Sequence, residues 1–69
     1  MDWSTMRVRL HAAPGFGGDE NRDKRKNWIA AALGYEKYFE GLNLFTAYQR
    51  ADAEQLAHVE QQLALLERP

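Results

Sequence analysis

The stretch that decides the fold is residues 5–11, Thr5-Met6-Arg7-Val8-Arg9-Leu10-His11. Apolar and polar residues alternate through it, so that in an extended chain Met6, Val8 and Leu10 share one face. This is the one strand-like alternation in the sequence, and a lone strand leaves its backbone N–H and C=O groups without partners in its own chain. The pattern therefore predicts either an extended arm over residues 1–13 that pairs with another chain, or a segment that is not a strand.

A break follows the arm at residues 14–18, Pro14-Gly15-Phe16-Gly17-Gly18. Proline fixes φ and the glycines remove any preference for regular structure, so we expect a loop. The glycines lack the Gly-Lys-Ser/Thr that a phosphate loop requires. Phe16 either packs back onto the helices or stands exposed, and we favour packing.

A first helix is predicted over residues 19–40. Asp19 and Glu20 place negative charge at its N-terminus, where the helix dipole favours it. Its apolar residues recur at spacings of three and four, which suits packing against a second helix: Trp28, Ala32, Tyr35, Phe39 and Leu42. Gly34 interrupts this helix at a cost of about 1 kcal/mol relative to alanine.

A turn at residues 41–43 and a second helix over residues 44–67 complete an αα-hairpin. Gly41 suits the end of the first helix and Asn43 can cap the second. However, Asp52 followed three residues later by Gln55 resembles a capping box, so the second helix is either continuous or broken near Ala51.

The chain of 69 residues is short and has no cysteine. A domain of this size buries only about 60% of the surface that its unfolded chain exposes, and no metal-ligand motif or cofactor fingerprint supplements the core. We therefore expect a mainly α fold whose uncovered apolar face pairs two copies into a helical bundle. The residues predicted at this dimer interface are Val8, Leu56, Val59, Leu63 and Leu66.

Charge is distributed unevenly along the sequence. Residues 1–26 contain six Lys or Arg against four acids, whereas residues 27–69 contain three against six. A basic segment of this kind is either a solvated helix surface or a surface that suits an acidic protein partner or nucleic acid. The predicted partner-binding residues are Arg7, Arg9, Arg25, Lys26, Tyr35 and Tyr38. No apolar run approaches the ~20 residues of a membrane span, so we expect a cytoplasmic protein.

No catalytic constellation is recognisable, and we expect a protein that is not an enzyme. Its overall make-up resembles small phage-encoded proteins that inhibit host machinery, such as anti-activators of quorum-sensing transcription factors. That resemblance involves no motif and carries over no binding residue, but it implies a module that masks a functional surface of a larger protein.

The alternative is a small dimeric DNA-binding repressor that uses Arg7 and Arg9 on its strand. The order strand, helix, helix resembles ribbon-helix-helix repressors, although the loop between the arm and the first helix is longer than in that family.

Overall fold

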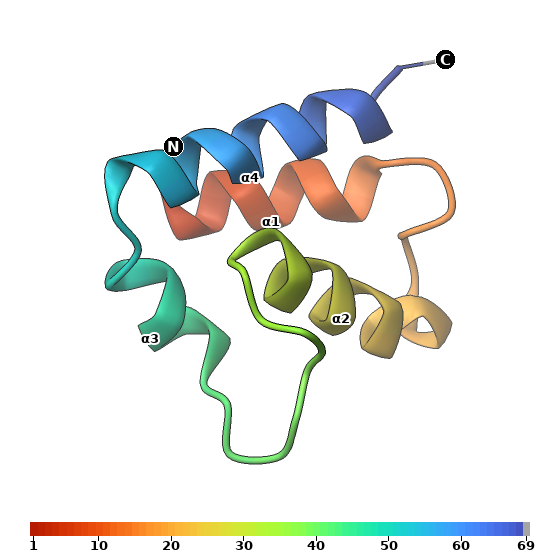
Figure 1. The fold of residues 1–69 in the computed structure, drawn as a ribbon. Coiled ribbons are helices and arrows are strands. Elements are labelled where there is room, and N and C mark those ends of the chain that lie inside the picture. The colour runs from red at the N-terminus through yellow and green to blue at the C-terminus, as the bar shows by residue number, and fades with distance from the viewer. Residues whose placement is uncertain (69) are drawn as a thin grey trace.

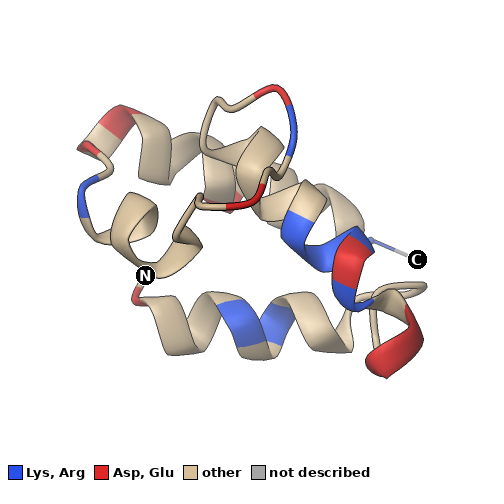
Figure 2. Ribbon diagram, turned by 90° about the horizontal axis from the view of Figure 1, so that it is seen from below, with Lys and Arg blue, Asp and Glu red and all other residues tan. Residues whose placement is uncertain are grey.

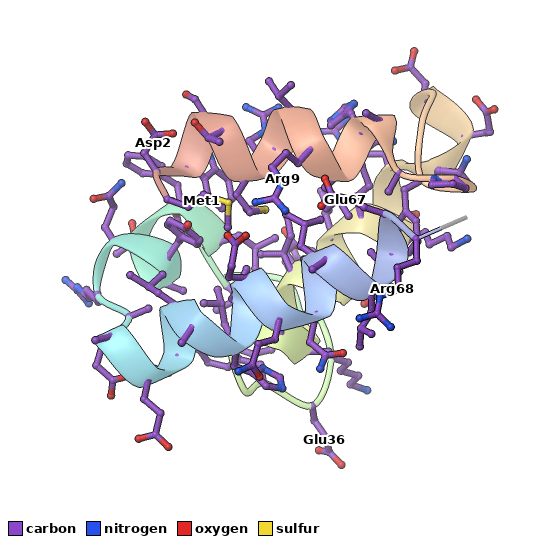
Figure 3. The ribbon with its side chains drawn as sticks, turned by 90° about the horizontal axis from the view of Figure 1, so that it is seen from above. Met1, Asp2, Arg9, Glu36, Glu67 and Arg68 are labelled. Carbon is purple, nitrogen blue, oxygen red and sulfur yellow. The ribbon has the colours of Figure 1, made fainter. Side chains whose placement is uncertain are left out.

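The computed structural model describes residues 1–68, which form four α-helices and one short 3-10 helix (Figure 1). The elements are α1 (Trp3–Ala12), η1 (Asp19–Asn21), α2 (Arg22–Ala32), α3 (Leu44–Gln49) and α4 (Ala53–Leu66). Helices α1 and α4 lie side by side in both Figure 1 and Figure 3 and run in the same direction. The mainly helical class is confirmed, and none of the residues from 1 to 68 forms a strand.

The extended arm predicted over residues 1–13 is wrong, because this segment is helix α1. Asp2 caps the helix by accepting a hydrogen bond from the Thr5 backbone N–H at 2.7 Å, and this bond lowers the pKa of the Asp2 carboxyl. Met6 and Leu10 lie one turn apart and are completely buried, whereas Val8 points away and is 70% exposed. The burial of one helical face therefore outweighs the alternating pattern.

Helix α2 ends at Ala32, so the prediction of one helix over residues 19–40 is also wrong. Gly34 adopts a φ of +99°, its N–H bonds the Ala31 carbonyl, and the Tyr35 N–H bonds the Ala30 carbonyl. These bonds form a Schellman motif, which needs a left-handed residue at the position that Gly34 occupies. Gly34 thus ends the helix, and residues 33–43 form an irregular segment, called here the aromatic loop.

Two helices replace the continuous one predicted over residues 44–67. Asn43 caps α3 through the Thr46 N–H at 2.9 Å, as predicted. Asp52 and Gln55 form the reciprocal bonds of a capping box, at 2.8 and 2.9 Å, and α4 starts there. The break that the sequence left open near Ala51 is therefore present, and the resulting corner lets α3 and α4 take different directions (Figure 1).

The core draws on all four α-helices and on the loop after α1. Its buried apolar residues are Met6, Leu10, Ala13, Phe16, Ile29, Ala32, Leu33, Tyr48, Val59 and Leu63. The side chain of Phe16 is buried, as expected.

The dimer interface predicted on α4 needs correction. Val59 and Leu63 are 1% and 0% exposed because they pack into the core of their own chain. Leu56 and Leu66 are half-buried against the same core, and Val8 is exposed on α1. Because α4 has 14 residues and not the predicted 24-residue span, the chain's other helices cover most of its apolar face.

Polar contacts tie α1 to the C-terminal half of the chain. The Arg9 guanidinium bonds Glu60 at 2.8 Å and Glu67 at 2.5 Å, so it lies between α1 and α4 (Figure 3). The hydroxyl of Tyr48 donates to the Met1 carbonyl at 2.8 Å, and burial, followed by the charges of Asp2 and Glu60, raises the pKa of this phenol. Among residues 1–68, no helix has the length and apolar character that crossing a membrane requires.

Truncation of Leu63 tests the assignment of α4 to the core. We expect Leu63→Ala to lower the free energy of unfolding by about 2–5 kcal/mol, because it opens a cavity in the core. The matched control is Leu65→Ala on the same helix, where the side chain is 52% exposed; a change within about 0.5 kcal/mol is expected. Urea denaturation followed by circular dichroism measures both, and equal losses would contradict the packing described here.

Acidification tests the contact between Arg9 and Glu67. The hydrogen bonds from Arg9 hold the pKa of Glu67 below its ordinary value of 4.5. A carboxyl whose pKa is lower in the folded state than in the unfolded state stabilises the fold. This stabilisation is complete when the pH is above the pKa of the unfolded state, and it is lost as the pH falls through the pKa of the folded state. We therefore expect the wild type to have a higher melting temperature than Glu67→Gln at neutral pH. The difference between the two melting temperatures should shrink as the pH falls below 4.5.

The control for this measurement is Glu36→Gln in the aromatic loop, where the carboxylate makes no ion pair within residues 1–68. Its melting temperature should follow that of the wild type at every pH. A wild-type advantage over Glu67→Gln that persists unchanged to low pH would argue against a charged contact.

Candidate functional site

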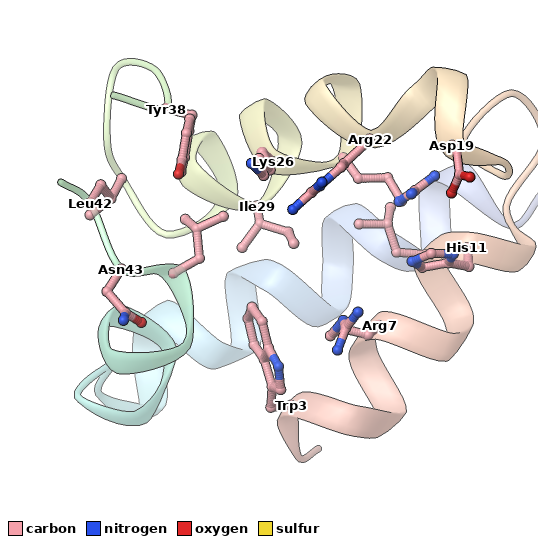
Figure 4. Close-up of a pocket in the computed structure, with 13 residues that line it drawn as sticks. Trp3, Arg7, His11, Asp19, Arg22, Lys26, Ile29, Tyr38, Leu42 and Asn43 are labelled. Carbon is pink, nitrogen blue, oxygen red and sulfur yellow. The ribbon is translucent and has the colours of Figure 1, made fainter. Parts of the chain in front are cut away.

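A groove of about 610 Å³ lies between α1 and α2 and is closed at one end by residues 38–44 (Figure 4). We call it the basic groove. Its lining consists of Trp3, Arg7, Leu10, His11, Asp19, Arg22, Arg25, Lys26, Ile29, Tyr38, Leu42, Asn43 and Leu44. The volume is that of a site for a small ligand or for a few side chains of a partner.

Helical spacing brings the basic residues of the groove together. Arg7 and His11 lie one turn apart on α1, and Arg22 and Lys26 lie one turn apart on α2. Figure 2 shows Lys and Arg on α1 and on the first turns of α2, the two helices that border the groove. Segments distant in sequence therefore combine into one positive surface.

The cations on the groove walls lack acidic partners among residues 1–68. In the part of the chain that the structure describes, Arg7, Arg22 and Lys26 have no carboxylate within 4.0 Å, whereas Arg9 has two. Asp19 is the one acidic residue of the lining and partly offsets their charge. Positive charge that is not neutralised internally remains available to an anionic group of a partner.

Aromatic rings hold two of these cations in place. The Lys26 ammonium lies 5.0 Å from the centre of the Tyr38 ring, and the Arg7 guanidinium lies 5.9 Å from that of Trp3. The backbone N–H of Tyr38 donates to the Asn27 side chain at 3.1 Å, which fastens the aromatic loop to α2. Cation–π contact positions a cation without neutralising its charge.

The imidazole of His11 reports the positive field of the groove. Burial lowers its pKa first, and the nearby charges of Arg25 and Arg7 lower it further, while Asp19 acts in the opposite direction. Burial and the two arginine charges thus both disfavour the imidazolium form.

Arg25, predicted to bind a partner, serves the fold. Its side chain is the buried charged one of the described residues, 7% exposed, and its guanidinium donates to the carbonyls of Phe16 at 2.5 Å and Gly18 at 2.7 Å. These bonds satisfy backbone oxygens of the loop between α1 and η1. Arg25 also lines the groove, and its Nη1 is the donor in both of these bonds.

The structure places four of the predicted partner-binding residues in the lining of the groove, namely Arg7, Arg25, Lys26 and Tyr38. It directs Arg9 toward α4 instead of the groove. Tyr35 is 40% exposed and packs edge-on against Phe39 at 6.4 Å, in a part of the aromatic loop outside the groove.

The predicted partner-binding set did not include Trp3, His11 and Arg22, which line the groove. Trp3, Arg7 and His11 follow one another at intervals of four, which is a face of a helix. That signal was readable only if residues 3–12 were taken as helical, and the alternating pattern favoured a strand.

Comparisons with protein-family models, with curated proteins and with solved structures found no match for this chain. Within residues 1–68, no group of three or more His, Asp or Glu side chains is arranged to hold a metal ion.

Removal of a groove cation should raise the pKa of His11. We expect this for Arg7→Gln, because it removes one of the charges that disfavour the imidazolium. The control Lys37→Gln removes a cation outside the groove and should leave the titration unchanged. Proton NMR of the His11 ring measures the shift; identical titrations of Arg7→Gln and the wild type would show that the field is not as described.

Proposed function

We propose that this protein is a non-enzymatic binding module that holds an acidic segment of a larger cytoplasmic protein in the basic groove. By covering that segment it blocks or modulates the partner, for which a transcription regulator is one candidate. The observation that carries the proposal is the set of groove cations, Arg7, Arg22 and Lys26, that have no carboxylate partner in the described chain.

The composition of the groove favours a protein segment over nucleic acid. Half-buried apolar and aromatic side chains share its lining with the cations, including Trp3, Tyr38 and Leu42. Aromatic and arginine side chains are enriched at the energetically important positions of protein interfaces. A phosphate backbone would use the cations and leave the apolar surface without a partner.

The DNA-binding alternative has lost its structural premise. Residues 5–11 are helical, so no strand presents Arg7 and Arg9 together to a DNA groove. Arg9 is engaged by Glu60 and Glu67, and the chain as a whole carries a net charge of −1. Duplex DNA is therefore included as a competing ligand in the binding experiment.

The groove also offers little for catalysis. Its lining contains no Ser, Thr or Cys nucleophile, and its single carboxylate and single imidazole come from Asp19 and His11. This lining supports a binding function over a catalytic one. The resemblance to phage-encoded inhibitors stays a prediction.

Binding of an acidic peptide tests the proposal. The probe is a fluorescent peptide of about ten residues that combines several Glu with Leu and Phe, an ordinary recognition length. We expect saturable binding by fluorescence anisotropy that weakens with added salt. Replacing Arg7, Arg22 and Lys26 together by Gln should raise Kd by about tenfold or more, which corresponds to about 1.4 kcal/mol.

The matched control replaces three cations outside the groove, Lys37, Arg50 and Arg68, by Gln. It changes net charge equally and should alter Kd by less than about threefold, because distant exposed charges are screened by salt. If the two triple variants raised Kd equally, binding would depend on net charge alone and not on the groove. Tighter binding of duplex DNA than of the peptide, lost in the groove variant, would replace the proposed function with nucleic-acid recognition.

A further inference from the structure

The basic groove has two chemically different ends. Figure 4 shows Arg7, His11, Arg22 and Asp19 toward one end, and Tyr38, Leu42 and Asn43 toward the other, with Trp3, Lys26 and Ile29 between them. We call these the cationic end and the apolar end. Their separation means that a single ion would use only part of the groove.

We infer that the groove recognises a composite element of its partner, in which a carboxylate side chain occupies the cationic end and a large apolar side chain the apolar end. This inference rests on the proposed function, since it specifies which acidic segments the groove accepts. A partner of this chemistry is an amphipathic acidic peptide, not a uniformly acidic tail.

The cationic end suits a carboxylate because two guanidinium groups, Arg7 and Arg22, face it from opposite helices. A guanidinium donates in a planar fork that matches the two oxygens of a carboxylate. Asp19 borders the same end and repels a second carboxylate placed beside it. The end therefore favours one well-placed acid over a dense acidic run.

The apolar end has surface that the fold leaves partly uncovered. At this end Tyr38, Leu42 and Leu44 are each half-buried, and next to them lie the half-buried Trp3 and the buried Ile29. A Leu or Phe side chain of a partner would bury this apolar surface together with its own apolar surface. Burial of one such side chain lowers Kd by about tenfold or more. The apolar contact is thus comparable in weight to the charged one.

The position of His11 at the cationic end supplies a reporter for it. Burial first, and then the charges of Arg25 and Arg7, lower the pKa of its imidazole, and a bound carboxylate would offset the part that is due to the two charges. Occupation of this end should therefore raise the pKa of His11, whereas contact restricted to the apolar end should not.

Four peptides of one length test the inference. The first carries a Glu and a Leu separated by a short spacer; the second replaces Glu by Gln, the third replaces Leu by Ser, and the fourth carries both changes. We expect each single change to raise Kd by about tenfold, which is the size of effect expected of one charged contact or one buried side chain. The pKa of His11 should rise only with the peptides that keep Glu.

Two protein variants assign each side chain to its end. Arg22→Gln should raise the Kd of the peptides that carry Glu and leave the Kd of the others unchanged. Leu42→Ala should raise the Kd of the peptides that carry Leu and leave the Kd of the others unchanged. Lys37→Gln, outside the groove, is the control for both, and the circular dichroism melting curve of each variant establishes that it folds.

The outcomes separate the inference from the proposed function. If the Glu peptides bind equally with Leu or Ser, or if Leu42→Ala affects all peptides alike, the groove reads charge alone and the inference is wrong while the proposed function stands. If no peptide binds, or if only duplex DNA does, the proposed function fails and the inference fails with it.

Discussion

The fold depends on the burial of one face of α1. Met6 and Leu10 are completely buried and contact a core built from residues of α2, α3 and α4. In a chain of 69 residues few side chains are available for such a core, so losing either would leave a large part of it open. Because that face of α1 points inward, Arg7 and His11 are turned toward the groove beside α2, and Arg9 toward α4.

Polar groups fix the loops that the thin core cannot hold. Arg25 bonds two carbonyls in the loop between α1 and η1, Lys24 bonds the Gly15 carbonyl at 2.9 Å, and Asn27 bonds the aromatic loop. Within residues 1–68, no buried side-chain nitrogen or oxygen lacks a hydrogen-bond partner. The residues of the basic segment 22–26 thus have two roles. Lys24 and Arg25 bond the loop between α1 and η1, while Arg22 and Lys26 line the groove. One local cluster of charge serves both architecture and recognition.

Local signals predicted the parts of the fold that local chemistry controls. The caps at Asn43 and Asp52 and the loop at residues 14–18 were recognisable, because side-chain hydrogen bonds to nearby N–H groups and the conformational limits of Gly and Pro act over a few residues. The strand over residues 5–11 and the long first helix were wrong for a different reason. An alternation of three apolar residues and a spacing of three and four are each compatible with more than one structure, and the core selects between them.

The sequence by itself determined a mainly helical chain, the caps that start α3 and α4, and an excess of positive charge in its first third. Only the tertiary structure decided which cations face a groove, which one is paired and which one is buried. The reason is that Arg7, Arg9 and Arg25 are chemically identical, and their roles differ through the carboxylates, carbonyls and rings that folding brings to them from elsewhere in the chain.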